Sequence, residues 1–106
     1  METYQVDGWT ALGDRTRRAI FERLVTGPCA VGEIASGLPV SRPAVSQHLK
    51  VLKEAGLVID RPAGNRRIYR VDPDGLGKLR AELDQFWNST LGAYKAAVEQ
   101  PSEEVS

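Results

Sequence analysis

The sequence has little of the chemistry that metal centres and redox sites require. Its 106 residues include one cysteine, Cys29, and one histidine, His48. A lone cysteine excludes a disulfide within the chain, and transition-metal sites need clustered nitrogen, sulfur or carboxylate ligands. We therefore expect no cofactor and no metal ion.

Long apolar runs and export signals are also missing. No apolar stretch approaches the roughly 20 residues that span a bilayer. The start of the chain, residues 1–8, is polar and is not a basic segment followed by an apolar one. We therefore expect a soluble, cytoplasmic protein without a membrane partner. This length fits one domain, residues 1–106, with a disordered tail at 100–106.

Sets of catalytic residues are absent from the sequence as well. It has no paired carboxylates near its histidine and no glycine-rich phosphate loop. To act as a general base, His48 would need a nucleophile within hydrogen-bond reach. The neighbouring Ser46 falls on a different side of the same predicted helix. We therefore expect that the chain is not an enzyme.

The chain does have a basic middle segment, which a net charge of zero conceals. Residues 1–39 carry a net charge of −1, residues 40–70 of +5, and residues 71–106 of −4. Binding of a polyanion depends on the local field rather than on the total charge. The middle segment therefore indicates a surface for nucleic acid.

The spacing of apolar and turn residues predicts a mainly α fold with a small β-hairpin, in all about five helices and a two-stranded wing. The expected helices are a short one ending at Gly13, then 15–25, 31–36 and 42–55, and a last one opened by Asp72-Pro73-Asp74. Extended runs at 57–61 and 67–71 flank a Gly-Asn turn. We expect the connection from 62 to 66 to be longer than a minimal turn and to protrude.

Start and stop signals support these boundaries. Asp14 and Ser41 are placed as N-caps, and Gly56 is placed as a C-terminal stop. The second helix gathers its apolar residues in one stripe: Ile20, Phe21, Leu24 and Val25. The fourth helix has a buried stripe of Val45, Leu49 and Leu52.

The last helix has an apolar seam that slips by one residue at Phe86-Trp87. We read this slip as a change of partner surface along the helix. The first half should cover the chain's own core, and the second half should face something else.

The order helix, short turn, helix and basic hairpin is that of a winged helix-turn-helix. Helix 42–55 buries one face and leaves the other free for DNA. Small, hydrogen-bonding Ser46 and Gln47 let that face enter a major groove, where Gln47 can pair with adenine. The predicted DNA contacts on this helix are Arg42, Pro43, Ser46, Gln47, His48, Lys50 and Lys53.

The hairpin repeats the basic pattern. Its arginines suit a minor groove or the flanking phosphates, and the predicted contacts are Arg61, Arg66, Arg67 and Arg70. Two assignments stay open. His48 either contacts DNA or packs against the neighbouring helix or wing. Cys29 is either a small buried hydrophobe or a thiol that oxidises or links two subunits.

Three segments carry a resemblance to a known family. They are Ala11-Leu-Gly-Asp-Arg-Thr-Arg-Arg-Ala-Ile, Val31-Gly-Glu-Ile-Ala, and the run from Ser41 to Val58. Together they resemble the ArsR/SmtB family of bacterial repressors over about residues 9–90. The resemblance implies a dimer built from the first and last helices, a recognition helix at 43–55, and binding to an imperfect palindrome at a promoter. It also implies repression, often of the protein's own operon, and release of DNA by a small ligand or ion.

The metal sites of this family are not matched. The third-helix site uses a Cys-Val-Cys-Asp-Leu-like run, and the corresponding residues are Ala30-Val31-Gly32-Glu33-Ile34, with Cys29 one residue out of register. The C-terminal site needs Asp, His and Glu at set steps, and residues 75–98 contain no histidine or cysteine. The resemblance is therefore to a branch without the metal-site cysteines.

The apolar residues of the first and last helices are the predicted dimer surface, because aromatic anchors dominate such interfaces. They are Val6, Trp9, Leu12, Phe86, Trp87, Leu91, Tyr94 and Val98. The aromatic members could instead line a pocket for a lipid or another apolar effector.

The function that we predict is a sequence-specific regulator of transcription. It binds double-stranded DNA at a palindromic operator as a homodimer and represses transcription, with its own operon as one expected target. The alternatives are a winged-helix module that binds protein or RNA, and a sensor that responds to a thiol reagent or ligand through Cys29.

Overall fold

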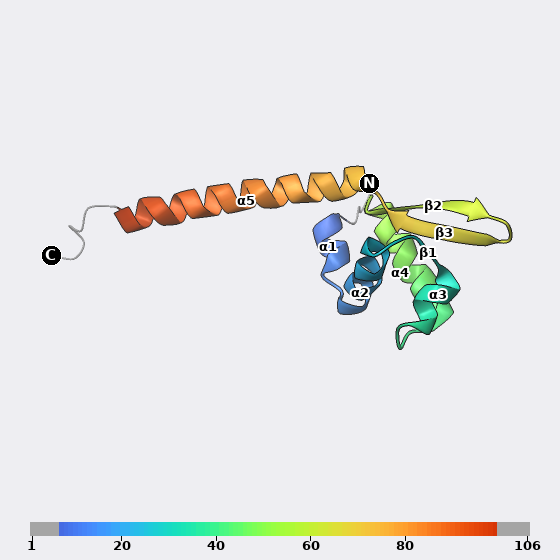
Figure 1. Cartoon of the computed structure of the whole chain (residues 1–106). Helices are drawn as coiled ribbons and strands as arrows, with labels where there is room; N and C mark the ends of the chain where they lie inside the picture. The colour runs from blue at the N-terminus through green and yellow to red at the C-terminus, as the bar shows by residue number, and fades with distance from the viewer. Residues whose placement is uncertain (1–6, 100–106) are drawn as a thin grey trace, which may run out of the picture.

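The computed structural model describes residues 7–99. Within them the chain forms five helices and three short strands: α1 (Gly8–Leu12), α2 (Arg15–Val25), β1 (Cys29–Ala30), α3 (Val31–Ser36), α4 (Arg42–Glu54), β2 (Val58–Ala63), β3 (Arg66–Val71) and α5 (Pro73–Glu99). Helices α1 to α4 and the sheet form a body, from which α5 extends as a long arm (Figure 1). The predicted fold class is confirmed, and the sheet has one strand more than expected. Between residues 7 and 99, no helix is long and apolar enough to cross a membrane.

The helices begin where side-chain oxygens satisfy their first N–H groups. The Asp14 carboxylate accepts from the Arg17 N–H at 2.8 Å, and the Ser41 hydroxyl accepts from the Ala44 N–H at 3.3 Å. Both N-caps were predicted from the sequence. Asp7 caps α1 in the same way, by accepting from the Thr10 N–H at 2.7 Å.

The core lies between the helices of the body and the inner face of the sheet. The predicted stripe of α4 is confirmed, since Val45, Leu49 and Leu52 are each 0% exposed. They pack with buried residues of α1, α2, β1, α3, β2 and the residue just before β2: Ala11, Ile20, Phe21, Leu24, Cys29, Ile34, Leu57 and Val58. The stripe predicted for α2 is wrong at its end, because Val25 lies in the last turn and is 59% exposed.

Helices α3 and α4 form the helix-turn-helix. The break between them lies at Gly37–Val40, where the Val40 N–H bonds to the Leu38 carbonyl at 2.8 Å. Ile34 of α3 is buried against the same core as the inner face of α4. The outer face of α4 is left in solvent.

The wing is a regular antiparallel hairpin. Strand β2 pairs with β3 from Val58↔Val71 to Ala63↔Arg66. Gly64 and Asn65 alone connect the strands, and Gly64 has φ +66°. Glycine at the first central position is the signature of a type II′ turn. The predicted longer connection from 62 to 66 is therefore wrong, although the tip does protrude (Figure 1).

The hairpin is part of a three-stranded sheet with the order β1-β3-β2. Strand β1 has two residues, which pair as Cys29↔Tyr69 and Ala30↔Ile68. This short strand was not predicted. It pairs the segment directly before α3 with the middle of β3. The start of the helix-turn-helix is therefore fixed to the wing by backbone hydrogen bonds.

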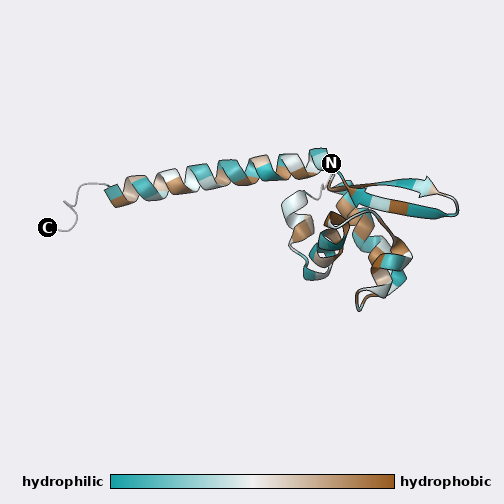
Figure 2. Cartoon of the chain, viewed as in Figure 1, coloured by the Kyte–Doolittle hydropathy of each residue, from teal (hydrophilic) through white to brown (hydrophobic). Residues whose placement is uncertain are grey.

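Helix α5 departs most from expectation. No residue between Pro73 and Glu99 is buried, and Leu79 is the apolar residue of this helix that packs partly against the core. The expectation that the first half of α5 covers the chain's own core is therefore wrong beyond its first turns. Leu83 is already 37% exposed. Apolar residues recur along the arm (Figure 2), and from Leu83 to Val98 the large ones are exposed.

Candidate nucleic-acid interface

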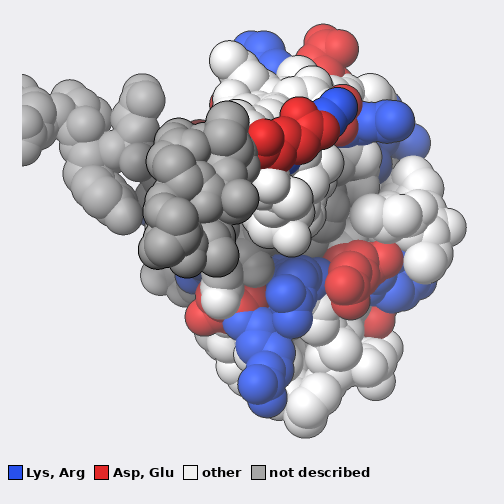
Figure 3. All heavy atoms as spheres, turned by 90° about the vertical axis from the view of Figure 1, so that its left-hand side faces the viewer, with Lys and Arg blue, Asp and Glu red and all other residues white. Residues whose placement is uncertain are grey.

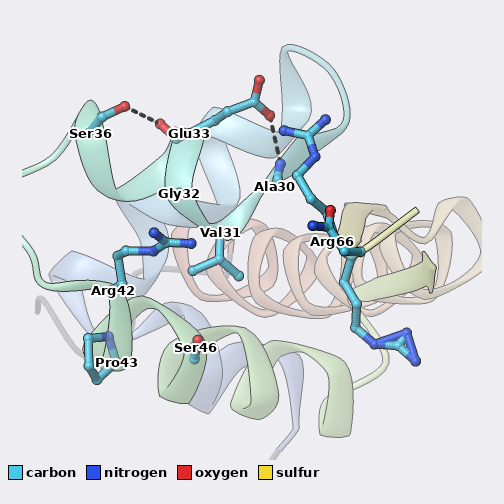
Figure 4. A pocket seen from close by; sticks show the side chains of 11 residues that line it. Ala30, Val31, Gly32, Glu33, Ser36, Arg42, Pro43, Ser46 and Arg66 are labelled. Carbon is cyan, nitrogen blue, oxygen red and sulfur yellow. Dashed lines mark hydrogen bonds between the residues drawn. The ribbon is translucent and has the colours of Figure 1, made fainter. Parts of the chain in front are cut away.

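A groove with a volume of about 670 Å³ lies between the helix-turn-helix and the tip of the wing. Its walls come from the start of α3, the first turns of α4 and the turn of the hairpin (Figure 4). The groove brings together five residues that the sequence predicted as DNA contacts: Arg42, Pro43, Ser46, Arg66 and Arg67.

The outer face of α4 is free and polar. Ser46, Gln47 and Lys50 are exposed, and Val45, Leu49 and Leu52 on the opposite face of the helix are fully buried. Gln47 and Lys50 do not line the groove, so they extend the polar surface along α4 beyond it. This face can approach a duplex without any change in the core.

Arg42 lies over the first turn of α3. A Cβ atom at Gly32 would be 3.4 Å from an Arg42 guanidinium nitrogen and 3.5 Å from the guanidinium carbon. The guanidinium therefore rests on the α3 backbone, where Gly32 has no side chain, and faces into the groove (Figure 4). This position places a permanent positive charge at the junction of the two helices.

The wing arginines divide between the two faces of the hairpin. Side chains alternate along a strand, so Arg66 and Arg70 share one face of β3 and Arg67 lies on the other. Arg61 pairs with Ile68 and belongs to the same face as Arg70. Arg66 and Arg67 are next to the turn and line the groove, but Arg61 and Arg70 do not.

Asp60 holds two of the predicted DNA contacts. Its side chain is 8% exposed, and its oxygens lie 2.9 Å from Lys53 Nζ and 3.4 Å from Arg67 Nε. The carboxylate thus connects the last turn of α4 to both strands of the wing. This role of Asp60 was not predicted, because a single acid within a basic segment gives no sign of its partners.

His48 is half-buried, unlike its neighbours on α4. Partial burial is what a packing role predicts, and contact of His48 with DNA stays a prediction.

Cys29 is 1% exposed and part of the core. Burial raises the pKa of its thiol, and only the thiolate is a nucleophile. The side chain therefore behaves as a small hydrophobe. In residues 7–99 no three histidine, cysteine, aspartate or glutamate side chains lie close enough together to hold a metal ion.

Two further residues shape the groove. Asn65 lines it from the turn of the hairpin. Glu33 also lines it and accepts a hydrogen bond from the Ala30 N–H at 2.9 Å (Figure 4). This bond lowers the pKa of Glu33 and keeps a negative charge at the start of α3. Glu33 takes the third helical position that glutamate has in a capping box, but alanine at the N-cap removes the usual Ser/Thr-x-x-Glu signature from the sequence.

The predicted dimer residues lie mostly on the outer surface of α5. Phe86, Trp87 and Leu91 are 59%, 49% and 53% exposed, and Tyr94 and Val98 are more exposed still. The Phe86 and Trp87 rings meet edge to face, with centroids 6.0 Å apart.

The α1 members of the predicted dimer set differ from one another. Trp9 is 43% exposed, and its indole N–H donates to Glu82 of α5 at 2.8 Å. Leu12 packs partly against the chain's own core. Val6 lies outside the described residues.

Charge is distributed unevenly between the faces of the body. On the side from which α5 projects, basic and acidic side chains are interspersed (Figure 3). The groove has three arginines and one glutamate among its lining residues. The groove is therefore the surface better suited to a polyanion.

Comparison with known proteins agrees with this geometry. Residues 12–61 match a family described as a helix-turn-helix domain. The chain is 58% identical to the HTH-type transcriptional regulator Rv2034 of Mycobacterium tuberculosis, over 98% of this chain and 99% of that protein. It is 34% identical to the arsenical resistance operon repressor of Escherichia coli, over 82% of this chain and 75% of the repressor.

Solved structures share the fold. An ArsR-like transcriptional regulator from Rhodococcus superposes with a TM-score of 0.71 at 32% identity, covering 88% of this chain and 91% of the other. A possible transcriptional regulator for arsenical resistance gives a TM-score of 0.70 at 45% identity, covering 82% and 91% of the two chains. The chain therefore belongs to the ArsR/SmtB family of DNA-binding transcriptional regulators and has the winged helix-turn-helix fold of that family.

Proposed function

We propose that this chain represses transcription by binding a palindromic operator as a homodimer, with α4 in the major groove and the wing on the adjacent backbone. The promoter of its own gene is the first operator to examine. The observation that carries the proposal is the groove, because it combines an exposed polar helix face with arginines from two separate elements. The attraction of the arginines for phosphates does not depend on base sequence. Ser46 and Gln47, by contrast, offer hydrogen bonds that discriminate between bases.

The dimer supports operator binding through symmetry. Two recognition helices can enter successive major grooves only if they lie about 34–36 Å apart. The exposed aromatic and aliphatic residues of α5 supply a surface for the second copy, and an exposed apolar surface of this kind marks an interaction site. Family members named as repressors also support the sign of regulation that we propose.

The experiment is a salt titration of binding to duplexes that the wild-type protein selects from fragments of its host genome. Contacts to phosphates release counterions, so affinity should fall steeply with salt, with a slope of about −0.9 per phosphate contact. Arg66→Ala should weaken binding to all sequences and reduce the slope by about 1. Gln47→Ala should change base preference, by about 1–3 kcal/mol at one position.

Arg80→Ala is the matched control. Arg80 lies on α5, its side chain is 82% exposed, and it does not line the groove. This variant removes the same charge and should bind as the wild type does. A flat salt response, or unchanged footprints for both Arg66→Ala and Gln47→Ala, would contradict the proposal. Competition by single-stranded RNA as strong as competition by the duplex would favour an RNA-binding module.

A further inference from the structure

Helix α5 meets the body in direct backbone contact at Gly75. A Cβ atom built on Gly75 would overlap the carbonyl oxygen of Gly56 and lie 2.8 Å from its carbonyl carbon. Real Cβ atoms essentially never approach other atoms within 3.0 Å. Because the neighbour is backbone and cannot rotate away, only glycine fits at position 75 with α5 in this position.

Gly56 is fixed by the end of the recognition helix. Its φ is +80°, its N–H bonds to the Lys53 carbonyl, and the Leu57 N–H bonds to the Leu52 carbonyl, both at 3.0 Å. These two bonds form a Schellman motif, which stabilises a helix C-terminus through a glycine in the left-handed conformation. The surface against which Gly75 rests is therefore the C-terminal cap of α4.

Two further contacts hold the first turns of α5. The Asp72 N–H donates to the Leu57 carbonyl at 2.9 Å, immediately before α5 begins. One turn after Gly75, Leu79 lies against α1, where a Cβ atom on Gly8 would be 2.8 Å from Leu79 Cδ1. The arm is thus seated at Gly75 and at Leu79, and the Trp9 indole N–H holds it once more at Glu82. Its large apolar residues from Leu83 onward are exposed.

We propose that Gly75 is a positioning residue that sets the angle between α5 and the recognition helix, and thereby the distance between the two recognition helices of a dimer. This inference rests on the proposed function. Gly75 touches no DNA in this scheme and acts through the cap of α4. It determines which half-site spacing the dimer accepts.

The geometry gives the size of the effect. Gly75 and Leu79 are about 6 Å apart along the helix. Moving α5 away from Gly56 by about 1 Å, with Leu79 as the pivot, tilts the arm by about 10°, or about 3 Å at Leu91, which lies about 18 Å further along. That shift is close to the ~3.4 Å rise of one base pair. A single methyl group at position 75 should therefore change the half-site spacing that fits.

The test compares Gly75→Ala with Gly77→Ala. Both variants replace a glycine by alanine in the first two turns of α5, and a Cβ atom at Gly77 would meet no atom within 4 Å. Affinity is measured on duplexes that carry the half-sites selected by the wild-type protein, at the selected spacing and with one base pair added or removed. Sedimentation and circular dichroism monitor the dimer and the fold.

We expect Gly77→Ala to bind as the wild type does. Folded, dimeric Gly75→Ala should lose about tenfold in affinity at the selected spacing and should prefer a changed spacing. Wild-type affinity and spacing preference in Gly75→Ala would overturn the inference. If Gly75→Ala does not fold, Leu79→Ala decides, because it removes the second seat of α5 without adding an atom. A twofold to fivefold loss with a broadened spacing preference supports the inference, and an unchanged spacing preference overturns it.

The control also separates this inference from the proposed function. If the wild type and Gly77→Ala bind no duplex, the proposed function fails. If both bind and Gly75→Ala binds in the same way, the proposed function stands and the role of Gly75 is refuted.

Discussion

The body, residues 7–72, buries its large apolar side chains, whereas the arm α5 exposes them. In the body, Ile20, Ile34 and Leu57 are among the large side chains with less than 2% of their surface exposed. In the arm, the large apolar residues from Leu83 to Val98 are between 37% and 67% exposed. The body therefore has a core of its own, and the arm has an apolar face that no other residue in the range 7–99 covers.

This difference implies that the body and the arm are stabilised by different contacts. Burial of apolar surface contributes about 25 cal/mol per Å², and in the body this gain comes from contacts within one chain. An isolated helix gains most of its stability from packing of its apolar face rather than from helix propensity. We therefore expect the body to fold on its own contacts and the arm to depend on a partner.

The largest expected effect is a core truncation in the body. Leu49→Ala removes a side chain that is 0% exposed and packs in the centre of the core. The loss of transfer free energy and the cavity left behind should lower the free energy of unfolding by about 2–5 kcal/mol. Urea denaturation followed by circular dichroism measures this change.

Leu91→Ala is the matched truncation in the arm. Leu91 is 53% exposed, so the same change should leave the free energy of unfolding per monomer nearly constant at protein concentrations below the dimerisation constant. Equal losses for Leu49→Ala and Leu91→Ala under those conditions would contradict the separation of body and arm.

The second prediction concerns association. Trp87→Ala should raise the dissociation constant of the dimer at least about thirtyfold, because buried aromatic anchors contribute about 2 kcal/mol or more at interfaces. Sedimentation equilibrium measures this constant. Asn88→Ala changes the adjacent exposed residue and should leave the constant unchanged. A monomer–dimer equilibrium that Trp87→Ala does not shift would show that this face of the arm is not the interface.

The third prediction compares an ion pair of the body with one of the arm. Asp60→Ala breaks the contacts of a nearly buried carboxylate with Lys53 and Arg67. Because both cations are about half exposed, they regain water, and we expect a loss of about 1 kcal/mol in the free energy of unfolding.

In the arm, Arg80→Ala breaks a pair with Asp84 that is 3.9 Å long and exposed on both sides. Exposed pairs at this helical spacing contribute about 0.3–0.5 kcal/mol. In denaturation experiments, Asp60→Ala should therefore lose measurably more free energy of unfolding than Arg80→Ala. A larger loss for Arg80→Ala than for Asp60→Ala would reverse the comparison.

The body was predictable from sequence wherever a local signal decides the structure. The caps at Asp14 and Ser41 were predicted because a side-chain oxygen at that position satisfies orphan N–H groups. Strand β1 was missed because its two residues are defined by pairing with Ile68 and Tyr69, about forty positions away. The Gly-Asn turn was predicted in the right place, but the connection was predicted too long because the pairing continues through Pro62 and Ala63. The order β1-β3-β2 makes β2 an edge strand, where proline is tolerated.

The groove was predictable in part for the same reason. The free face of α4 follows from its apolar spacing, which defines the buried side and hence the exposed one. The division of the wing arginines depends on the register of the hairpin, which places Arg67 beside Asp60 and Arg66 on the opposite face. The seating of the arm depends on a contact between Gly75 and Gly56, and no periodic pattern in either segment indicates it.

The smallest expected effect is a pH dependence of stability that comes from the N-cap of α2 in the body. The hydrogen bond from the Arg17 N–H holds the pKa of Asp14 below its usual value of 3.8. A carboxyl whose pKa is lower in the folded state stabilises that state above its unfolded pKa. It loses the contribution as pH falls through the folded pKa. Asp14→Asn keeps a good N-cap and removes this titration, so its melting temperature at pH 7 should lie within about 2 °C of the wild type.

Between pH 5 and pH 2, the melting temperature of Asp14→Asn should fall less than that of the wild type, because one of the carboxyls linked to acid unfolding is gone. Thermal melts at both pH values, followed at the helix signal, measure the difference. Asp84→Asn on the exposed surface of α5 is the control and should follow the wild type, because the arm adds little to the unfolding of the body. Parallel pH profiles for Asp14→Asn and the wild type would show that the cap of α2 is not linked to the stability of the core beneath it.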